Sequence, residues 1–247
     1  MNKISIFLLF KISLQDITID YHHSKISYLW IPVSFVILVF AKGFFLGGIL
    51  GMDSNYILYL CIGVWIWNYI SLAVISYGNI LFNNHLIFNI NINPHQVLNI
   101  LQFRLLITFF LNLIVLFFFL LFFTIQFNVL AFFLGSLALI VLTHQVGKLL
   151  SIISLYYRDV TQLINSMMIV LFFLSPIFWY PQQLSAGKLY LLKFNPVYHI
   201  LNVFRDAIMM GSFNKEGFVV MTSLTIVLFI INYLFTNKQI SNCATKI

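Results

Sequence analysis

Charged residues are scarce in this sequence: only 8% of its 247 residues are Asp, Glu, Lys or Arg, and 62% are hydrophobic. Soluble domains carry roughly 25% charged residues, so this composition excludes a soluble globule. With a mean hydropathy of +1.00, the chain is expected to cross a membrane several times. Repeated apolar runs with short connections leave no room for a separate soluble domain, which predicts a single membrane domain over residues 1–247.

Several chemistries are missing from the sequence as well. There is no GxxxxGK[ST] motif, so the chain has no P-loop with which to bind a nucleotide phosphate. The six histidines have no metal-ligand spacing and no Ser-His-acid frame is recognisable, so neither a metal site nor catalytic residues are expected. The basic residues never form the run of about five to eight that a nucleic-acid patch needs. The two cysteines lie in segments of different polarity, which argues against a disulfide.

Six apolar segments approach or exceed the length of about twenty residues that crosses a hydrocarbon core of about 30 Å. They are 28–50, 56–76, 105–125, 127–156, 163–180 and 217–236. Residues 1–27 are expected to form an N-terminal helix in the membrane interface, with a disordered leader as the alternative. Residues 237–247 are expected to form a cytoplasmic tail. The predicted fold is therefore an all-α membrane protein with a six-span bundle over 28–236.

An even number of spans puts both termini on one side of the membrane. Eight basic residues then fall on the side of the termini and five on the other, which favours cytoplasmic termini. The six acidic residues all fall outside the spans, so the energy for any uphill transport is expected to come from another subunit. Pro94 is expected to begin the helix that leads into the third span, and a tight turn around Gln126 is expected to join the third and fourth spans.

The fourth span contains the nearest approach to a buried polar cluster, formed by His144, Gln145 and Lys148. Interhelical hydrogen bonds are favoured there over a substrate site.

The segment between the fifth and sixth spans is not an ordinary loop. Ser175-Pro176 interrupts the fifth span, and Ser185 is expected to cap a short helix. Asn195 is a good N-cap for a second helix with Pro196 at its first position. One face of this second helix is apolar and the other polar, which predicts an amphipathic helix that dips toward the membrane. The apolar face comprises Val197, Ile200, Leu201, Phe204 and Ile208, and the polar face His199, Asn202, Arg205 and Asp206.

These residues together carry a resemblance to a known family. Arg158-Asp159, Ser175-Pro176-Ile177-Phe178, Asn195-Pro196 and Arg205 are similar to the pattern of the permease subunit of polysaccharide ABC exporters, which move O-antigen, capsule or teichoic acid. Residues 21–32 (YHHSKISYLWIP) and 59–67 (YLCIGVWIW) also resemble the entry to the first span and the second span of that family. Where the family has Arg-Asp in its N-terminal helix, this chain has Gln15-Asp16.

The resemblance implies six transmembrane helices, an N-terminal interface helix and two short re-entrant outer helices that act as a gate. It also implies a homodimer with two ATP-binding cassette subunits in the inner (plasma) membrane, a polyprenyl-linked glycan as substrate, and no cofactor other than the ATP that the partner binds. The residues expected to couple to the ATPase are His85, Leu86, Ile87, Phe88, Arg158 and Asp159. Those expected to form the outer gate are Ser175, Pro176, Asn195, Pro196 and Arg205.

Two other functions stay open at this point. One is an ABC exporter permease for a drug or a small lipid, which usually lacks the outer segment from Ser175 to Pro196. The other is a membrane-embedded enzyme that modifies a glycan, for which Asp206 beside Arg205 is the one outer acid–base candidate.

Overall fold

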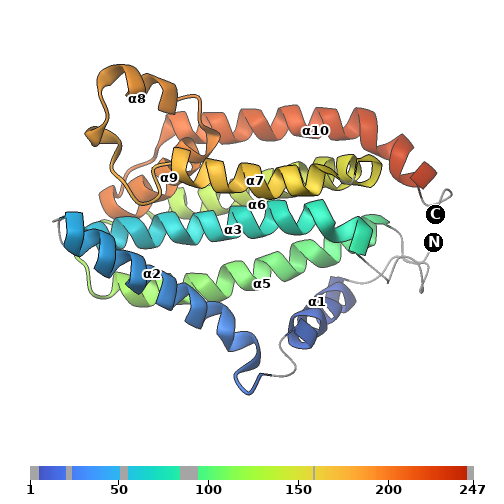
Figure 1. The fold of residues 1–247 in the computed structure, drawn as a ribbon, viewed down its shortest axis with the longest axis horizontal. Coiled ribbons are helices and arrows are strands. Elements are labelled where there is room, and N and C mark those ends of the chain that lie inside the picture. The colour runs from blue at the N-terminus through green and yellow to red at the C-terminus, as the bar shows by residue number, and fades with distance from the viewer. Residues whose placement is uncertain (1–5, 21–23, 51–54, 84–93, 158, 244–247) are drawn as a thin grey trace.

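A computed structural model describes residues 6–20, 24–50, 55–83, 94–157 and 159–243, and over these ranges the chain is all-helical (Figure 1). The helices are α1 (Ile6–Asp20), α2 (Trp30–Leu50), α3 (Tyr56–Asn83), α5 (Pro94–Leu120), α6 (Val129–Tyr156), α7 (Asp159–Leu174), α8 (Ala186–Leu192), α9 (Pro196–Arg205) and α10 (Lys215–Cys243). A π-helical turn, Asp206–Met210, continues α9, and short 3₁₀ turns lie at Ser27–Leu29 and Pro181–Gln183. The start of α5 at Pro94 confirms that prediction.

Four of the described helices are long and apolar enough to cross a membrane. Their candidate spans are Tyr56–Ile80, His95–Leu120, Val129–Tyr156 and Lys215–Leu234. The predicted first and fifth spans correspond to shorter apolar helices over the described residues, Ser27–Gly43 and Asp159–Leu174. The chain is therefore an all-helical membrane protein.

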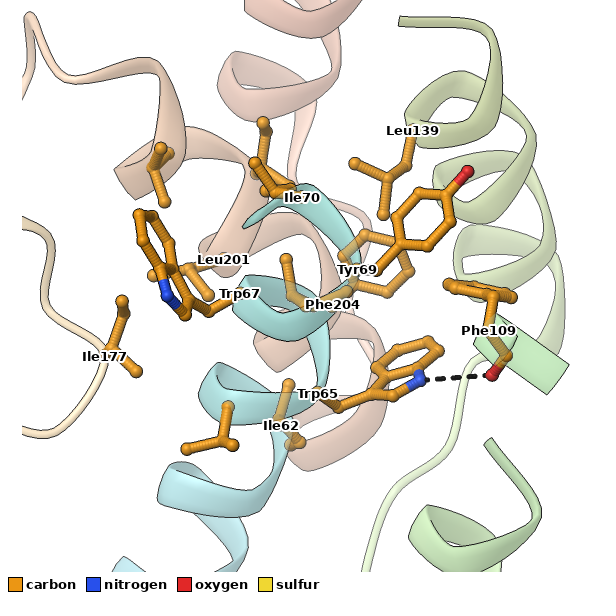
Figure 2. Packing of buried hydrophobic residues seen from close by; sticks show 14 of the residues in the cluster. Ile62, Trp65, Trp67, Tyr69, Ile70, Phe109, Leu139, Ile177, Leu201 and Phe204 are labelled. Carbon is orange, nitrogen blue, oxygen red and sulfur yellow. Dashed lines mark hydrogen bonds between the residues drawn. The ribbon is translucent and has the colours of Figure 1, made fainter. Parts of the chain in front are cut away.

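Helix α3 is the centre of the bundle and packs against α2, α5, α6, α7 and α9. Trp65 in its middle is almost completely buried and its ring contacts Phe109 of α5, Phe132 of α6 and Phe204 of α9. The indole N–H of Trp65 points to the Phe109 carbonyl at 3.5 Å (Figure 2). A side chain of this size, shared by four helices, fixes their spacing because buried aromatic rings pack without voids.

Hydrogen bonds between polar side chains join several helices of the bundle. The hydroxyl of Tyr77 on α3 lies 2.7 Å from His144 Nδ1 on α6 and 2.8 Å from Gln102 Oε1 on α5. The side-chain amide of Asn232 on α10 donates to Gln145 Oε1 at 2.8 Å. The prediction that His144 and Gln145 make interhelical hydrogen bonds is confirmed.

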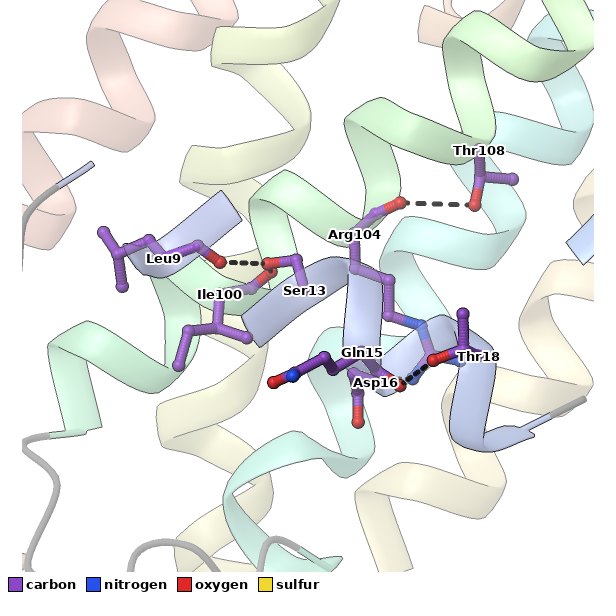
Figure 3. A network of polar contacts seen from close by, with 8 residues as sticks. All are labelled: Leu9, Ser13, Gln15, Asp16, Thr18, Ile100, Arg104 and Thr108. Atoms are coloured by element: carbon purple, nitrogen blue, oxygen red, sulfur yellow. Dashed lines mark hydrogen bonds and ion pairs between the residues drawn. The ribbon is translucent and has the colours of Figure 1, made fainter. Parts of the chain in front are cut away.

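Helix α1 docks on α5, which confirms a helix near the N-terminus. The Ser13 hydroxyl lies 2.8 Å from the Ile100 carbonyl, and Arg104 Nη1 forms an ion pair with Asp16 Oδ2 at 2.7 Å (Figure 3). The opposite side of α1 exposes apolar side chains such as Phe7 and Ile19. In Figure 1, α1 and the C-terminal end of α10 lie at the same end of the bundle, and α8 lies at the other.

One predicted connection is wrong. Residues 121–128 separate α5 from α6 in place of a tight turn at Gln126, because Asn128 caps α6 and its N–H donates to the Ala207 carbonyl at 2.8 Å. Helix α7 ends at Leu174, which confirms the predicted break at Ser175-Pro176. Helix α10 continues to Cys243, through most of the predicted tail; residues 237–243 contain neither Gly nor Pro to end a helix.

Candidate functional site

The site is built around a break in the chain after α7. Helix α7 ends at Leu174, and α8 begins only at Ala186. Pro176 has no N–H to continue the helical ladder and its ring clashes with the preceding turn. The end of α7 and the residues that follow therefore leave backbone carbonyls without helical partners, and buried carbonyls need partners elsewhere.

Two tyrosines from the N-terminal end of α3 bind these carbonyls. The hydroxyl of Tyr56 donates to the Phe178 carbonyl at 2.6 Å. The hydroxyl of Tyr59 lies 3.1 Å from the Pro176 carbonyl and 2.9 Å from the Trp179 carbonyl. The irregular segment is thus tied to the central helix of the bundle by side chains rather than by secondary structure.

Asn195 ties the same segment to the start of α9. Its Oδ1 accepts from the Val197 N–H at 2.9 Å, which confirms the predicted N-cap. Its Nδ2 donates to Ser175 Oγ at 3.0 Å and approaches the Leu174 carbonyl at 3.4 Å. The predicted cap of α8 is only half right, because Ser185 occupies the N-cap position but its side chain makes no capping hydrogen bond.

Arg205 completes the site from the end of α9. Its Nη2 donates to the Ile177 carbonyl at 3.2 Å and lies 3.5 Å from the Tyr59 carbonyl. The guanidinium lies over the Tyr59 ring at 3.4 Å from the ring centroid. Nε and Nη1 are buried and have no hydrogen-bond partner among the described residues. Arg205 and His199, which were predicted for the polar face of α9, are both buried, and each contacts a backbone carbonyl.

The charge of Arg205 survives this burial. Desolvation lowers the pKa of the guanidinium to about 10, and electrostatic interactions with Tyr59, Tyr180 and Asp206 oppose that shift. Arg205 is therefore protonated at neutral pH. The face of the Tyr59 ring replaces part of the lost hydration, since a cation over an aromatic face is stabilised by about 2 kcal/mol or more when it is desolvated.

Gly63 belongs to the site although sequence reasoning did not single it out. A Cβ atom at this position would lie 2.7 Å from the Ile177 carbonyl oxygen and 2.8 Å from Arg205 Nη2, well inside van der Waals contact. Tyr56, Tyr59 and Gly63 recur at spacings of three and four, so they share one face of α3. This spacing is the feature of the sequence that could have identified Gly63 as part of the site. Tyr59 and Gly63 both lie in the segment 59–67.

The structure brings together the predicted gate residues, and of the predicted coupling residues it describes only Asp159. Ser175, Pro176, Asn195 and Arg205 lie around the break, and Pro196 occupies the first position of α9. Residues 85–88 and Arg158 lie outside the described residues. Asp159 is exposed and begins α7 at the end of the bundle opposite the break (Figure 1).

The fold and the site define the class of the molecule, an all-helical membrane protein with an irregular segment buried at one end of its bundle. No model of a known protein family matches the sequence, and no curated protein matches it either. Among the described residues, no group of three or more His, Cys, Asp or Glu side chains could hold a metal ion.

Proposed function

We propose that this chain is the permease subunit of an ABC exporter that translocates a lipid-linked polysaccharide across the inner (plasma) membrane. The observation that supports it best is the break after α7, where side chains of α3, of α9 and of its N-cap lie within hydrogen-bond distance of the carbonyls of residues 174 and 176–179. Irregular backbone at membrane depth is tolerated only where it is buried in protein or lines a water-filled path. A break in the helix whose carbonyls are contacted by side chains of neighbouring helices is a suitable place for a gate.

In this proposal α2 and α7 are the first and fifth of six membrane spans, and α8 and α9 are re-entrant outer helices. Both termini are cytoplasmic, and α1 lies in the inner interface. The break is then at the outer side, where a glycan would leave.

The proposal needs two partners. The sequence has no P-loop, so ATP hydrolysis belongs to a separate ATP-binding cassette subunit present in two copies. A second copy of this chain would cover part of the apolar surface of α7, where Met167, Val170 and Leu174 are exposed. The working unit is then a homodimer of this chain with two ATP-binding subunits and a polyprenyl-linked glycan as substrate.

Co-purification with the ATP-binding subunit encoded beside the gene tests the proposal. Asp159 and Glu216 are exposed acidic residues in the first turns of α7 and α10, at opposite ends of the bundle. We expect Asp159→Lys to reduce retention of the ATP-binding subunit and its ATPase activity in proteoliposomes. The matched variant Glu216→Lys should leave both unchanged. A chain that purifies alone, or equal effects of the two variants, would contradict the proposal.

The two alternative functions, a drug exporter and a glycan-modifying enzyme, can be distinguished from the proposed polysaccharide exporter by the phenotype of mutants. Deletion should remove surface polysaccharide, whereas a drug exporter would lose drug resistance instead. For a glycan-modifying enzyme, Asp206 would have to act on substrate, but its Oδ2 accepts a hydrogen bond from Asn214 Nδ2 at 2.6 Å and so has a structural partner. We expect Asp206→Asn to retain polysaccharide export, and complete loss of product with normal membrane insertion would favour the enzyme.

A further inference from the structure

A second polar site lies away from the break, in a pocket of about 220 Å³ between α1, α2, α3 and α5. Three aliphatic side chains form part of its wall. The polar part of the wall comprises Ser34, Asn68, Arg104, Thr108 and Asn112. Because Arg104, Thr108 and Asn112 are spaced by four residues, they form a stripe along one face of α5.

The oxygen atoms of this pocket act as hydrogen-bond acceptors. The Ser34 hydroxyl donates to the Ile31 carbonyl at 2.9 Å, and the Thr108 hydroxyl donates to the Arg104 carbonyl at 3.2 Å. A hydroxyl has one hydrogen, so both side chains retain only lone pairs for a ligand. Asn112 is 5% exposed, and its Oδ1 has no hydrogen-bond partner among the described residues. A buried acceptor without a donor is costly, so the pocket favours a ligand that brings N–H or O–H groups.

The edge of the pocket carries one charge of each sign. Arg104 reaches from α5 to Asp16 of α1, and their ion pair is partly exposed to the surroundings (Figure 3). The pair is neutral as a whole, so it does not favour a ligand with a net charge. A zwitterion can place its anion beside the guanidinium, which has five N–H donors to share, and its cation toward the acceptor oxygens and the Asp16 carboxylate.

We propose that this pocket binds the phosphoethanolamine headgroup of a membrane lipid. The ammonium supplies three N–H donors, for Asn112 Oδ1 and the hydroxyl oxygens of Ser34 and Thr108, and the phosphate lies against Arg104. Thr108 is one helical turn of 5.4 Å from Arg104, a separation that suits the two-carbon linker between phosphate and ammonium. This inference is independent of the proposed export function.

Size and surroundings favour a lipid as the source of the headgroup. The pocket is smaller than the roughly 300 to 1,000 Å³ of sites that enclose a drug-sized molecule, so the acyl chains would remain outside. Helix α1 beside the pocket exposes Phe7 and Ile19, as expected of a helix that lies against lipid.

Lipid retention by the purified full-length protein, measured by native mass spectrometry, tests the headgroup chemistry. Phosphatidylethanolamine, phosphatidylcholine and phosphatidylglycerol with identical acyl chains are compared, because the choline headgroup is also zwitterionic but has no N–H donor. We expect phosphatidylethanolamine to be retained best. Asn112→Leu should lower its retention about fivefold, as for one lost hydrogen bond, without lowering the unfolding temperature, since it removes an unsatisfied buried oxygen.

Asn165→Leu is the matched control, because Asn165 is a partly buried asparagine on α7, outside the pocket. Ser34→Ala is a second pocket variant and should also weaken retention. Equal retention of the three lipids, or unchanged selectivity in both Asn112→Leu and Ser34→Ala, would overturn the proposal. Free O-phosphoethanolamine distinguishes the source: weaker binding of it than of phosphatidylethanolamine supports the lipid, and tighter binding of the free compound would overturn the lipid as the natural ligand.

Discussion

Gly63→Ala is the sharpest perturbation of the site around the break. The new methyl group would lie 2.7 Å from the Ile177 carbonyl oxygen and 2.8 Å from Arg205 Nη2, so one of these groups must move. Overpacking of this kind costs about 1–3 kcal/mol. Loss of the hydrogen bond from Arg205 to Ile177 adds about 1.5–3 kcal/mol, because the donor is charged. The higher helix propensity of alanine stabilises the variant by about 1 kcal/mol. The net loss of unfolding free energy is therefore about 2–5 kcal/mol.

Chemical unfolding in detergent, followed by circular dichroism, measures this loss. The control is Gly187→Ala in α8, where an added Cβ atom meets nothing within 4 Å and only the gain in helix propensity remains. The two variants should therefore shift the unfolding midpoint in opposite directions. A Gly63→Ala protein that unfolds at the wild-type midpoint would refute the argument that close packing at Gly63 seats Arg205 on the break.

Three further changes follow from the same contacts. Asn195→Ala removes an N-cap worth about 1 kcal/mol and should reduce polysaccharide export more than membrane insertion, as transport and fractionation assays would measure. Tyr59→Phe retains the ring under Arg205 but leaves buried carbonyls without a donor, so the unfolding free energy should fall by about 1–3 kcal/mol, whereas Tyr157→Phe, at an exposed tyrosine, should change nothing. Asp16→Arg should lower the thermal midpoint slightly at low salt, since a partly exposed pair contributes about 0–1 kcal/mol, and adding Arg104→Asp should restore it.

Local chemistry predicted part of this molecule well. Pro94 at the start of α5 and Asn195 at the cap of α9 follow from backbone preferences of single residues, which hold whatever the rest of the chain does. The all-helical membrane class follows from composition. The break at Ser175-Pro176 follows α7 as predicted, since proline cannot continue a helix. The connection between α5 and α6 was placed wrongly because apolar length, on which the span boundaries rested, does not report where a helix stops.

The role of Arg205 could not be predicted in the same way. Helical periodicity separates the two faces of α9 but does not say what each face meets. The carbonyl that Arg205 binds belongs to Ile177, and the ring beneath it belongs to Tyr59, far away in the sequence. The close approach at Gly63 depends on the same long-range packing.

The hydrogen bonds around α9 fasten only one of the two short helices between α7 and α10. Besides the contact of Arg205 with α3, the Asn128 backbone N–H donates to the Ala207 carbonyl and the Asn128 side-chain amide to the Gly211 carbonyl at 3.2 Å. Helix α9 is thereby fastened at both ends. Helix α8 has open space at Gly187 and exposes Tyr190 and Leu191. A lid that opens at this end of the bundle would therefore swing on α8 alone, with α9 as the fixed frame against which it closes.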